Sequence, residues 1–125
     1  MGKIITCSLG RVKDFEADAK YFIVLRPGKV NIPGLRHHPE LAPSSELFLW
    51  TQAHKHEPDW FTTYSEWFRR DMRERAGLRD AIDKLEQDAK VKTILLVCFC
   101  ADVNACHRGL EADELARRGV EVLRY

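Results

Sequence analysis

The grouping of apolar residues along the chain predicts four strands. Lys3–Cys7 is a short β-rich run, and Tyr21–Leu25 is a continuous apolar run. Val91–Cys100 holds the longest apolar stretch, and Val120–Leu123 is expected to return as a last strand. Because the run Tyr21–Leu25 is continuous rather than alternating in polarity, we expect that strand to be covered on both faces.

Helical spacing of apolar residues predicts the elements between those strands. A helix is expected over residues 44–53, capped by Ser44, although a strand at Leu47–Trp50 fits the same residues. Asp59 is expected to cap a second helix, and Gly77 should break or bend it before a further helical stretch. Its apolar residues form an aromatic stripe that we interpret as core: Trp60, Phe61, Tyr64, Trp67, Phe68 and Met72.

The last third of the chain predicts the sheet topology. We expect a helix that starts at Asp102 or Asn104 and ends near Arg118, between two strands. A strand, a helix and a strand in this order form a right-handed βαβ unit. Residues 28–43, rich in Gly and Pro, are expected to be a loop. The prediction is a single compact three-layer α/β domain over residues 1–125, with an at least partly parallel sheet and helices on both faces.

Composition narrows the class of protein. The chain has 125 residues, of which 45% are hydrophobic and 31% charged, as in an ordinary globular domain. With 20 Lys and Arg against 19 Asp and Glu, the net charge of +1 gives no sign of a strongly basic nucleic-acid binder. The sequence shows neither a membrane-spanning run nor a signal peptide, so we expect no membrane partner and a cytoplasmic location.

Candidate chemistry gathers where the clearest strand is expected to meet the last helix. Three of the four cysteines, Cys98, Cys100 and Cys106, lie within nine residues and are followed by His107 and Arg108. In a cytosolic chain such a cluster is more often catalytic, metal-binding or redox-active than a structural disulfide. Ligands of open α/β sheets bind at the carboxyl ends of strands, and helix N-termini attract anions.

These positions suggest a role for each residue. Near a helix N-terminus and two basic side chains, Cys106 would have a lowered thiol pKa and is the preferred nucleophile, with His107 as proton carrier. Arg26 ends another strand, so Arg26 and Arg108 are expected to bind an anion together, with Ser8 beside them. The supporting residues of this pocket are expected to be Cys98, Cys100, Asp102 and Asn104.

Three alternatives use the same residues. Zinc accepts ligands such as Cys98, Cys100, Cys106 and His107, but adjacent Cys106 and His107 rarely point the same way. A Cys100–Cys106 disulfide would make a redox switch. In the third alternative the cluster is structural: Cys98 packs as a small hydrophobe, and Arg108 pairs with a carboxylate to hold the loop.

The motif also resembles a known family. Leu95-Leu96-Val97-Cys98, the acidic Asp102 and the run Cys106-His107-Arg108 are similar to the domain of unknown function 488 family, and similarity extends over most of the chain. Members usually carry Glu where this chain has Cys100. The resemblance implies a compact three-layer α/β fold and implies no established reaction.

The sequence therefore predicts an α/β protein that binds an anionic small molecule or a phosphate group at the strand ends. Thiol-based catalysis is a possible use of that pocket, and no cofactor is expected. A non-catalytic module that binds nucleic acid or a protein is the alternative. Nucleic acid is not favoured, because the aromatic residues form a helical stripe rather than alternating with Lys and Arg on a surface. Whether the chain is an enzyme, and its oligomeric state, stay open.

Overall fold

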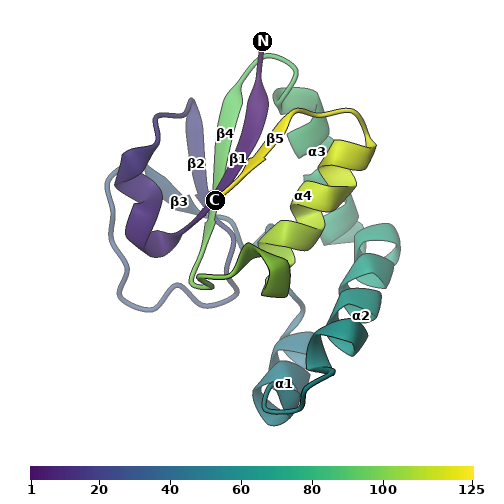
Figure 1. Ribbon diagram of the computed structural model, residues 1–125. Helices are drawn as coiled ribbons and strands as arrows, with labels where there is room; N and C mark the ends of the chain where they lie inside the picture. The colour runs from purple at the N-terminus through teal and green to yellow at the C-terminus, as the bar shows by residue number, and fades with distance from the viewer.

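The computed structural model describes residues 1–125 and contains one sheet of five parallel strands in the order β3-β2-β4-β1-β5 (Figure 1). The strands are β1 (Lys3–Ser8), β2 (Ala19–Phe22), β3 (Leu35–His37), β4 (Thr93–Cys98) and β5 (Val122–Arg124). β4 and β1 lie in the middle, and their central residues are buried, as is usual for strands of a parallel sheet that are covered on both faces. The predicted α/β class and parallel sheet are confirmed.

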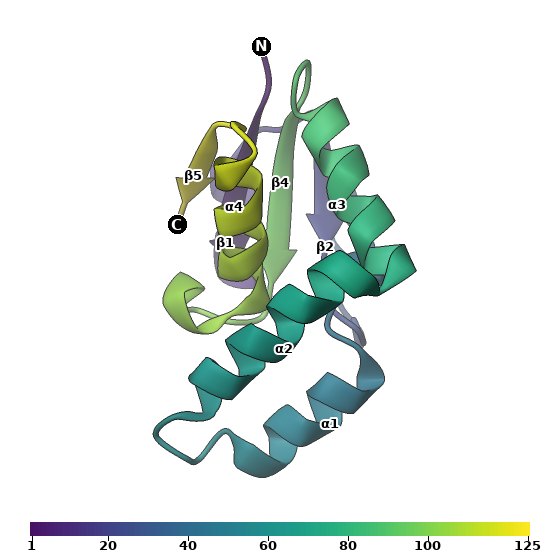
Figure 2. The ribbon, with the colours of Figure 1, turned by 90° about the vertical axis from the view of Figure 1, so that its right-hand side faces the viewer.

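Four α-helices gather on one side of this sheet. They are α1 (Ser45–His54), α2 (Trp60–Glu74), α3 (Ala76–Asp88) and α4 (His107–Arg117). α3 and α4 run along the sheet face, whereas α1 and α2 lie beyond the end of the β4 arrow (Figure 2). The opposite face is covered by the 3₁₀-helix η1 (Leu9–Asp14), which contacts β1 and β4. The expected layers are therefore present, but they are unequal in thickness.

Local sequence signals explain several element ends. The Ser44 hydroxyl accepts a hydrogen bond from the Leu47 amide at 3.1 Å, so the predicted cap starts α1, and the alternative strand is not formed. Gly119, with a φ of 92°, follows α4 in the left-handed conformation that glycine tolerates best. None of the helices combines the length and the apolar character that crossing a bilayer requires.

Two strand predictions are corrected by pairing with distant residues. β2 begins two residues earlier than expected and ends at Phe22, because Ala19–Phe22 pair with Ile94–Val97 of β4. β3 lies inside the stretch expected to be a loop and pairs only with β2. With a single apolar residue, Leu35, this short edge strand has no pattern that could distinguish it from a loop.

Two helix boundaries also differ from the prediction. The break between α2 and α3 falls at Arg75, whose backbone is extended and whose guanidinium donates to the carbonyl oxygen of Ala42 at 2.9 Å. α4 begins at His107 rather than at Asp102 or Asn104. The 3₁₀-helix η3 (Val103–Ala105) takes up those residues, and Asp102 caps that turn instead by accepting from the Asn104 amide at 2.9 Å.

Candidate functional site

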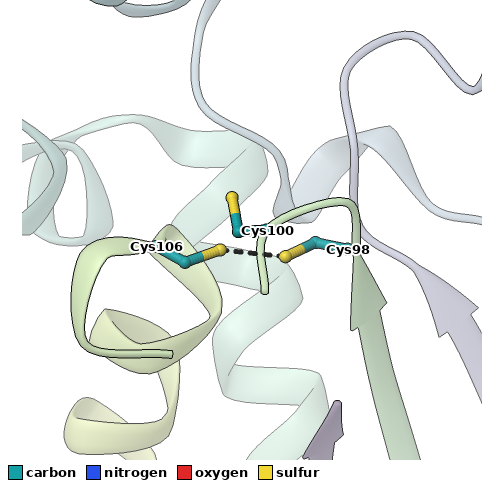
Figure 3. Close-up of side chains that lie close together, drawn as sticks. All are labelled: Cys98, Cys100 and Cys106. Atoms are coloured by element: carbon teal, nitrogen blue, oxygen red, sulfur yellow. Dashed lines mark hydrogen bonds between the residues drawn. The ribbon is translucent and has the colours of Figure 1, made fainter. Parts of the chain in front are cut away.

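Three cysteines converge at the carboxyl edge of the sheet. Cys98 is the last residue of β4, Cys106 is the N-cap of α4, and Cys100 lies in the loop between them. The Sγ atoms of Cys98 and Cys106 are 2.9 Å apart, and all three sulfur atoms lie within 4.8 Å of one another (Figure 3). All four cysteines of the chain are free thiols, and Cys7 stands outside this cysteine cluster. The thiols in hydrogen-bond contact are thus Cys98 and Cys106, and the Cys100–Cys106 disulfide considered from the sequence is not formed.

His107 is fixed beside the cysteine cluster in one tautomer. Its Nε2 lies 2.6 Å from the carbonyl oxygen of Ile23, which can only accept, so Nε2 carries the proton and donates it. The other ring nitrogen, Nδ1, is therefore an acceptor, 3.8 Å from the Sγ of Cys106. Burial lowers the pKa of His107, which keeps this imidazole neutral near pH 7.

The side chain of Arg108 lies inside the protein. It is 0% exposed, and its guanidinium donates to Thr6 Oγ1 and to the main-chain oxygens of Tyr125, Cys100 and Ala101 at 2.7–3.2 Å. These bonds join α4, β1 and the loop after β4. The expectation that Arg108 clamps a ligand anion in the pocket does not fit this geometry, because Nη1 and Nη2 both donate to the chain itself and Nε is buried without a partner. No Asp or Glu pairs with it, so the expected carboxylate partner is not found either.

The three thiols differ in how readily they ionise. Cys98 and Cys106 are buried, whereas Cys100 is accessible. The neighbouring Cys106 and Cys98 thiols, acting as donors, lower the pKa of Cys100, and the charge of Arg108 adds to this effect. The contact with Cys100 in turn raises the pKa of Cys98 to about 12, and it raises the pKa of Cys106 still further. Of the three thiols, Cys100 is therefore the one that ionises most readily, whereas the sequence favours Cys106.

A pocket of about 500 Å³ opens above the cysteine cluster, within the usual size of small-molecule sites. The cluster and His107 form one side, and α1 and the start of α2 form the other. No Asp or Glu lines it, whereas two cations do, Arg26 and Lys55. Its remaining lining residues are Val24, Leu25, Pro43, Phe48, Thr51, Gln52, Trp60, Tyr64, Phe99 and Ala105.

Only part of the predicted site is brought together here. Arg26, Cys98, Cys100, Cys106 and His107 all line this pocket. Ser8, although it pairs with Cys98 in the sheet, and the capping residues Asp102 and Asn104 do not line it. Asn104 instead borders a separate hollow of about 170 Å³ that also reaches Cys106.

Sequence reasoning missed the far wall of the pocket. Lys55 lies just after α1 in an exposed segment that shows no motif. Trp60 and Tyr64 belong to the stripe interpreted as core, and Tyr64 is indeed 5% exposed, yet both also line the pocket. The length of the aromatic stripe was the available signal. The elements that pack against α2 do not cover the whole stripe, so the aromatic residues of its first turn face the pocket instead.

Together, the fold and the site define a parallel α/β domain with a thiol cluster at its strand ends. Residues 22–119 match the family model DUF488-N3a, which is described as the active DUF488-N3 subclade. The chain belongs to the DUF488 family, as its Cys-His-Arg motif indicates. Comparison with curated proteins gave no match, and comparison with solved structures gave none either.

Proposed function

We propose that the pocket above the cysteine cluster binds a small anionic ligand, such as a molecule that carries a phosphate group. One observation carries this proposal: the lining contains the cations Arg26 and Lys55 and no carboxylate. Neither cation forms an ion pair with another residue of the chain, so both charges are available to a ligand. The N-terminus of α4, at His107, opens on the same space and favours negative charge.

The walls of the pocket favour a ligand that also has an apolar part. Phe48, Trp60, Tyr64 and Phe99 contribute aromatic surface. The Arg26 guanidinium lies 5.8 Å from the centre of the Phe48 ring, which restricts its orientation through a cation–π contact. An anion held by Arg26 would thus have an aromatic surface beside it for the rest of the molecule.

Thiol-based catalysis is a second candidate, favoured by the accessible sulfur of Cys100 at the floor of the same pocket. In this candidate Cys100 is the nucleophile in place of Cys106. Cys106 and the Nδ1 of His107 stand behind it as a route for its proton. The description of the matching family model as an active subclade supports a catalytic use.

Alkylation of Cys100 by charged and neutral reagents tests both candidates. Reduced protein in the presence of a chelator is treated with iodoacetate, which is anionic, or with iodoacetamide, which is neutral, and mass spectrometry locates the label. We expect Cys100 to react first and to prefer iodoacetate more than a free thiol does. Arg26→Gln and Lys55→Gln should each reduce this preference by about fivefold, which corresponds to losing about 1 kcal/mol of charge attraction. Inorganic phosphate should slow the reaction by competing for the same cations.

Lys92→Gln is the matched control, because Lys92 is an exposed lysine directly before β4, at the opposite end of the sheet from the site. Its reagent preference should equal that of the unmodified chain. If Arg26→Gln and Lys55→Gln also leave the preference unchanged, the pocket does not select anions. If Cys106 is labelled before Cys100, the role of Cys100 as nucleophile is refuted.

A further inference from the structure

We propose that Cys98, Cys100 and Cys106 bind a soft divalent metal ion, with Zn²⁺ the best match, and leave its fourth coordination position open toward the pocket. This metal site goes beyond the proposed anion binding and does not depend on it. Three protein ligands and one open position are the usual arrangement where zinc does chemistry, whereas structural zinc sites have four protein ligands.

The separation of the sulfur atoms fits one shared ion. Tetrahedral zinc with Zn–S bonds of about 2.3 Å places its sulfur ligands roughly 3.8 Å apart. The three Sγ atoms already lie within 4.8 Å of one another, and the Cys98–Cys106 pair only has to open from 2.9 Å (Figure 3). Changes of this size are within the reach of side-chain rotation, so the backbone does not have to refold around the ion.

The elements that carry the thiols are suited to hold a metal. Cys98 ends a central strand and Cys106 caps a buried helix, so both are fixed by packing. Cys100 lies in the loop between them, but its carbonyl oxygen accepts from the Arg108 guanidinium at 3.2 Å. The site therefore has two rigid ligands and one that can adjust while its backbone stays anchored.

The charges around the cluster favour the metal-bound form. A Zn²⁺ ion with three thiolates carries a net charge of −1, and the cationic guanidinium of the buried Arg108 lies next to the cluster, where it donates to the carbonyl oxygen of Cys100 at 3.2 Å. On metal binding, each thiol that is still protonated releases its proton to solvent, and no electron transfer is involved.

A disulfide between Cys98 and Cys106 is the competing use of the same atoms, and it would remove two of the three ligands. The test is therefore made on the full chain under a non-chelating reductant, after removal of metal. Titration with Co²⁺ should give thiolate-to-cobalt charge-transfer absorption and the visible bands of tetrahedral cobalt, with saturation at about one equivalent per chain. Added Zn²⁺ should displace the cobalt, so that the charge-transfer absorption and the visible cobalt bands both disappear.

Cys100→Ser is the decisive variant, because Cys100 is accessible and its replacement leaves the core intact. We expect its Zn²⁺ affinity to fall by more than about 100-fold, since loss of an outer-shell partner alone can cost about that much. Cys7→Ala, which removes a buried cysteine outside the cluster, should bind cobalt and zinc unchanged. Cys98→Ser and Cys106→Ser extend the series if circular dichroism shows that they fold.

Absence of thiolate-to-cobalt absorption in the unmodified chain would overturn the proposal, as would equal Zn²⁺ affinity in Cys100→Ser. Because the alkylation experiment is made with a chelator present, anion selectivity can succeed while metal binding fails, and the reverse. Alkylation of Cys100 in the presence and absence of metal is a third measurement of binding at the cluster. Saturating Zn²⁺ should protect Cys100 from iodoacetamide, and unchanged alkylation in its presence would place the metal elsewhere.

Discussion

At the scale of single residues, Arg108 decides the shape of the site. A fully buried guanidinium is costly unless its donors are satisfied. Here Nη1 and Nη2 reach oxygen atoms of Thr6, Tyr125, Cys100 and Ala101, and only Nε is left without a partner. Two of these acceptors are carbonyls of the loop that carries Cys100. Arg108 therefore positions that thiol without touching the pocket.

Replacing Arg108 with Lys should destabilise the fold. A lysine ammonium has three donors and no planar fork, so some of the buried oxygens lose their partner. We expect Arg108→Lys to lower the free energy of unfolding by about 2–4 kcal/mol in urea denaturation. Arg73→Lys, at an exposed arginine without an ion pair, should change it by less than about 0.5 kcal/mol. Equal stabilities of the two variants would contradict this structural role.

Glu111 is a second buried residue with an unusual charge state. It lies on α4, is 0% exposed, and neither carboxyl oxygen has a hydrogen-bond partner. Burial raises its pKa well above the ordinary value, although the nearby Arg75 acts in the opposite direction. The residue is therefore neutral in the folded protein at a pH where it is ionised in the unfolded chain.

This difference makes stability depend on pH. A group whose folded pKa is raised contributes stability that is full below its unfolded pKa of about 4.5 and is lost as the pH rises toward its folded pKa. We expect Glu111→Gln to match the unmodified chain near pH 4 and to be more stable by about 1–3 kcal/mol at pH 7. Denaturant melts across this range measure the gap. A gap that does not widen with pH would show that Glu111 is ionised in the fold.

At the scale of elements, the junction of η3 and α4 sets where the last helix begins. A side chain at Gly109 would place its Cβ 2.0 Å from the carbonyl oxygen of Val103. Only glycine lets η3 fold back against the first turn of α4 and leave Cys106 at the N-cap beside Cys98. The close approach of backbone to backbone thus brings two of the three thiols together.

Two glycine substitutions separate this packing effect from helix propensity. Gly109→Ala should cost about 2–4 kcal/mol, because backbone must move to relieve the contact, and should weaken labelling selectivity at Cys100. Gly77→Ala, in α3 with nothing near its Cβ, should instead stabilise the protein by about 0.5–1 kcal/mol. Thermal and urea melts of both variants measure this. Similar changes in the two would mean that the η3–α4 contact has no special role.

At the scale of the whole molecule, the parallel order of the sheet creates the site. β1, β2 and β4 all end at one edge, and α1 and α2 lie beyond that edge instead of covering the sheet face (Figure 2). The space between the strand ends and these helices is the pocket. Its cations come from residues far apart in sequence, Arg26 after β2 and Lys55 after α1. The fold therefore determines the sign of its charge.

The sequence alone was sufficient for the features that depend on local chemistry. Continuous apolar runs identified the buried strands, Ser44 identified the start of α1, and the Cys-His-Arg run identified a site at a strand-to-helix junction. These follow from residue preferences within one or two turns of chain. The sequence predicted a loop where β3 forms, and it placed the start of α4 too early. Both predictions were wrong because strand pairing and the η3 turn override weak local preferences.

Only the tertiary structure decided which groups share the pocket. Arg26 and Arg108 look equivalent in the sequence, yet one faces the pocket and the other is buried under the loop, because burial depends on contacts with β1 and the chain end. The same applies to the thiols. The sequence placed three cysteines close together, and the three-dimensional packing exposed Cys100 while it buried Cys98 and Cys106. Burial and charge are properties of the space around an atom, and distant segments of the chain fill that space.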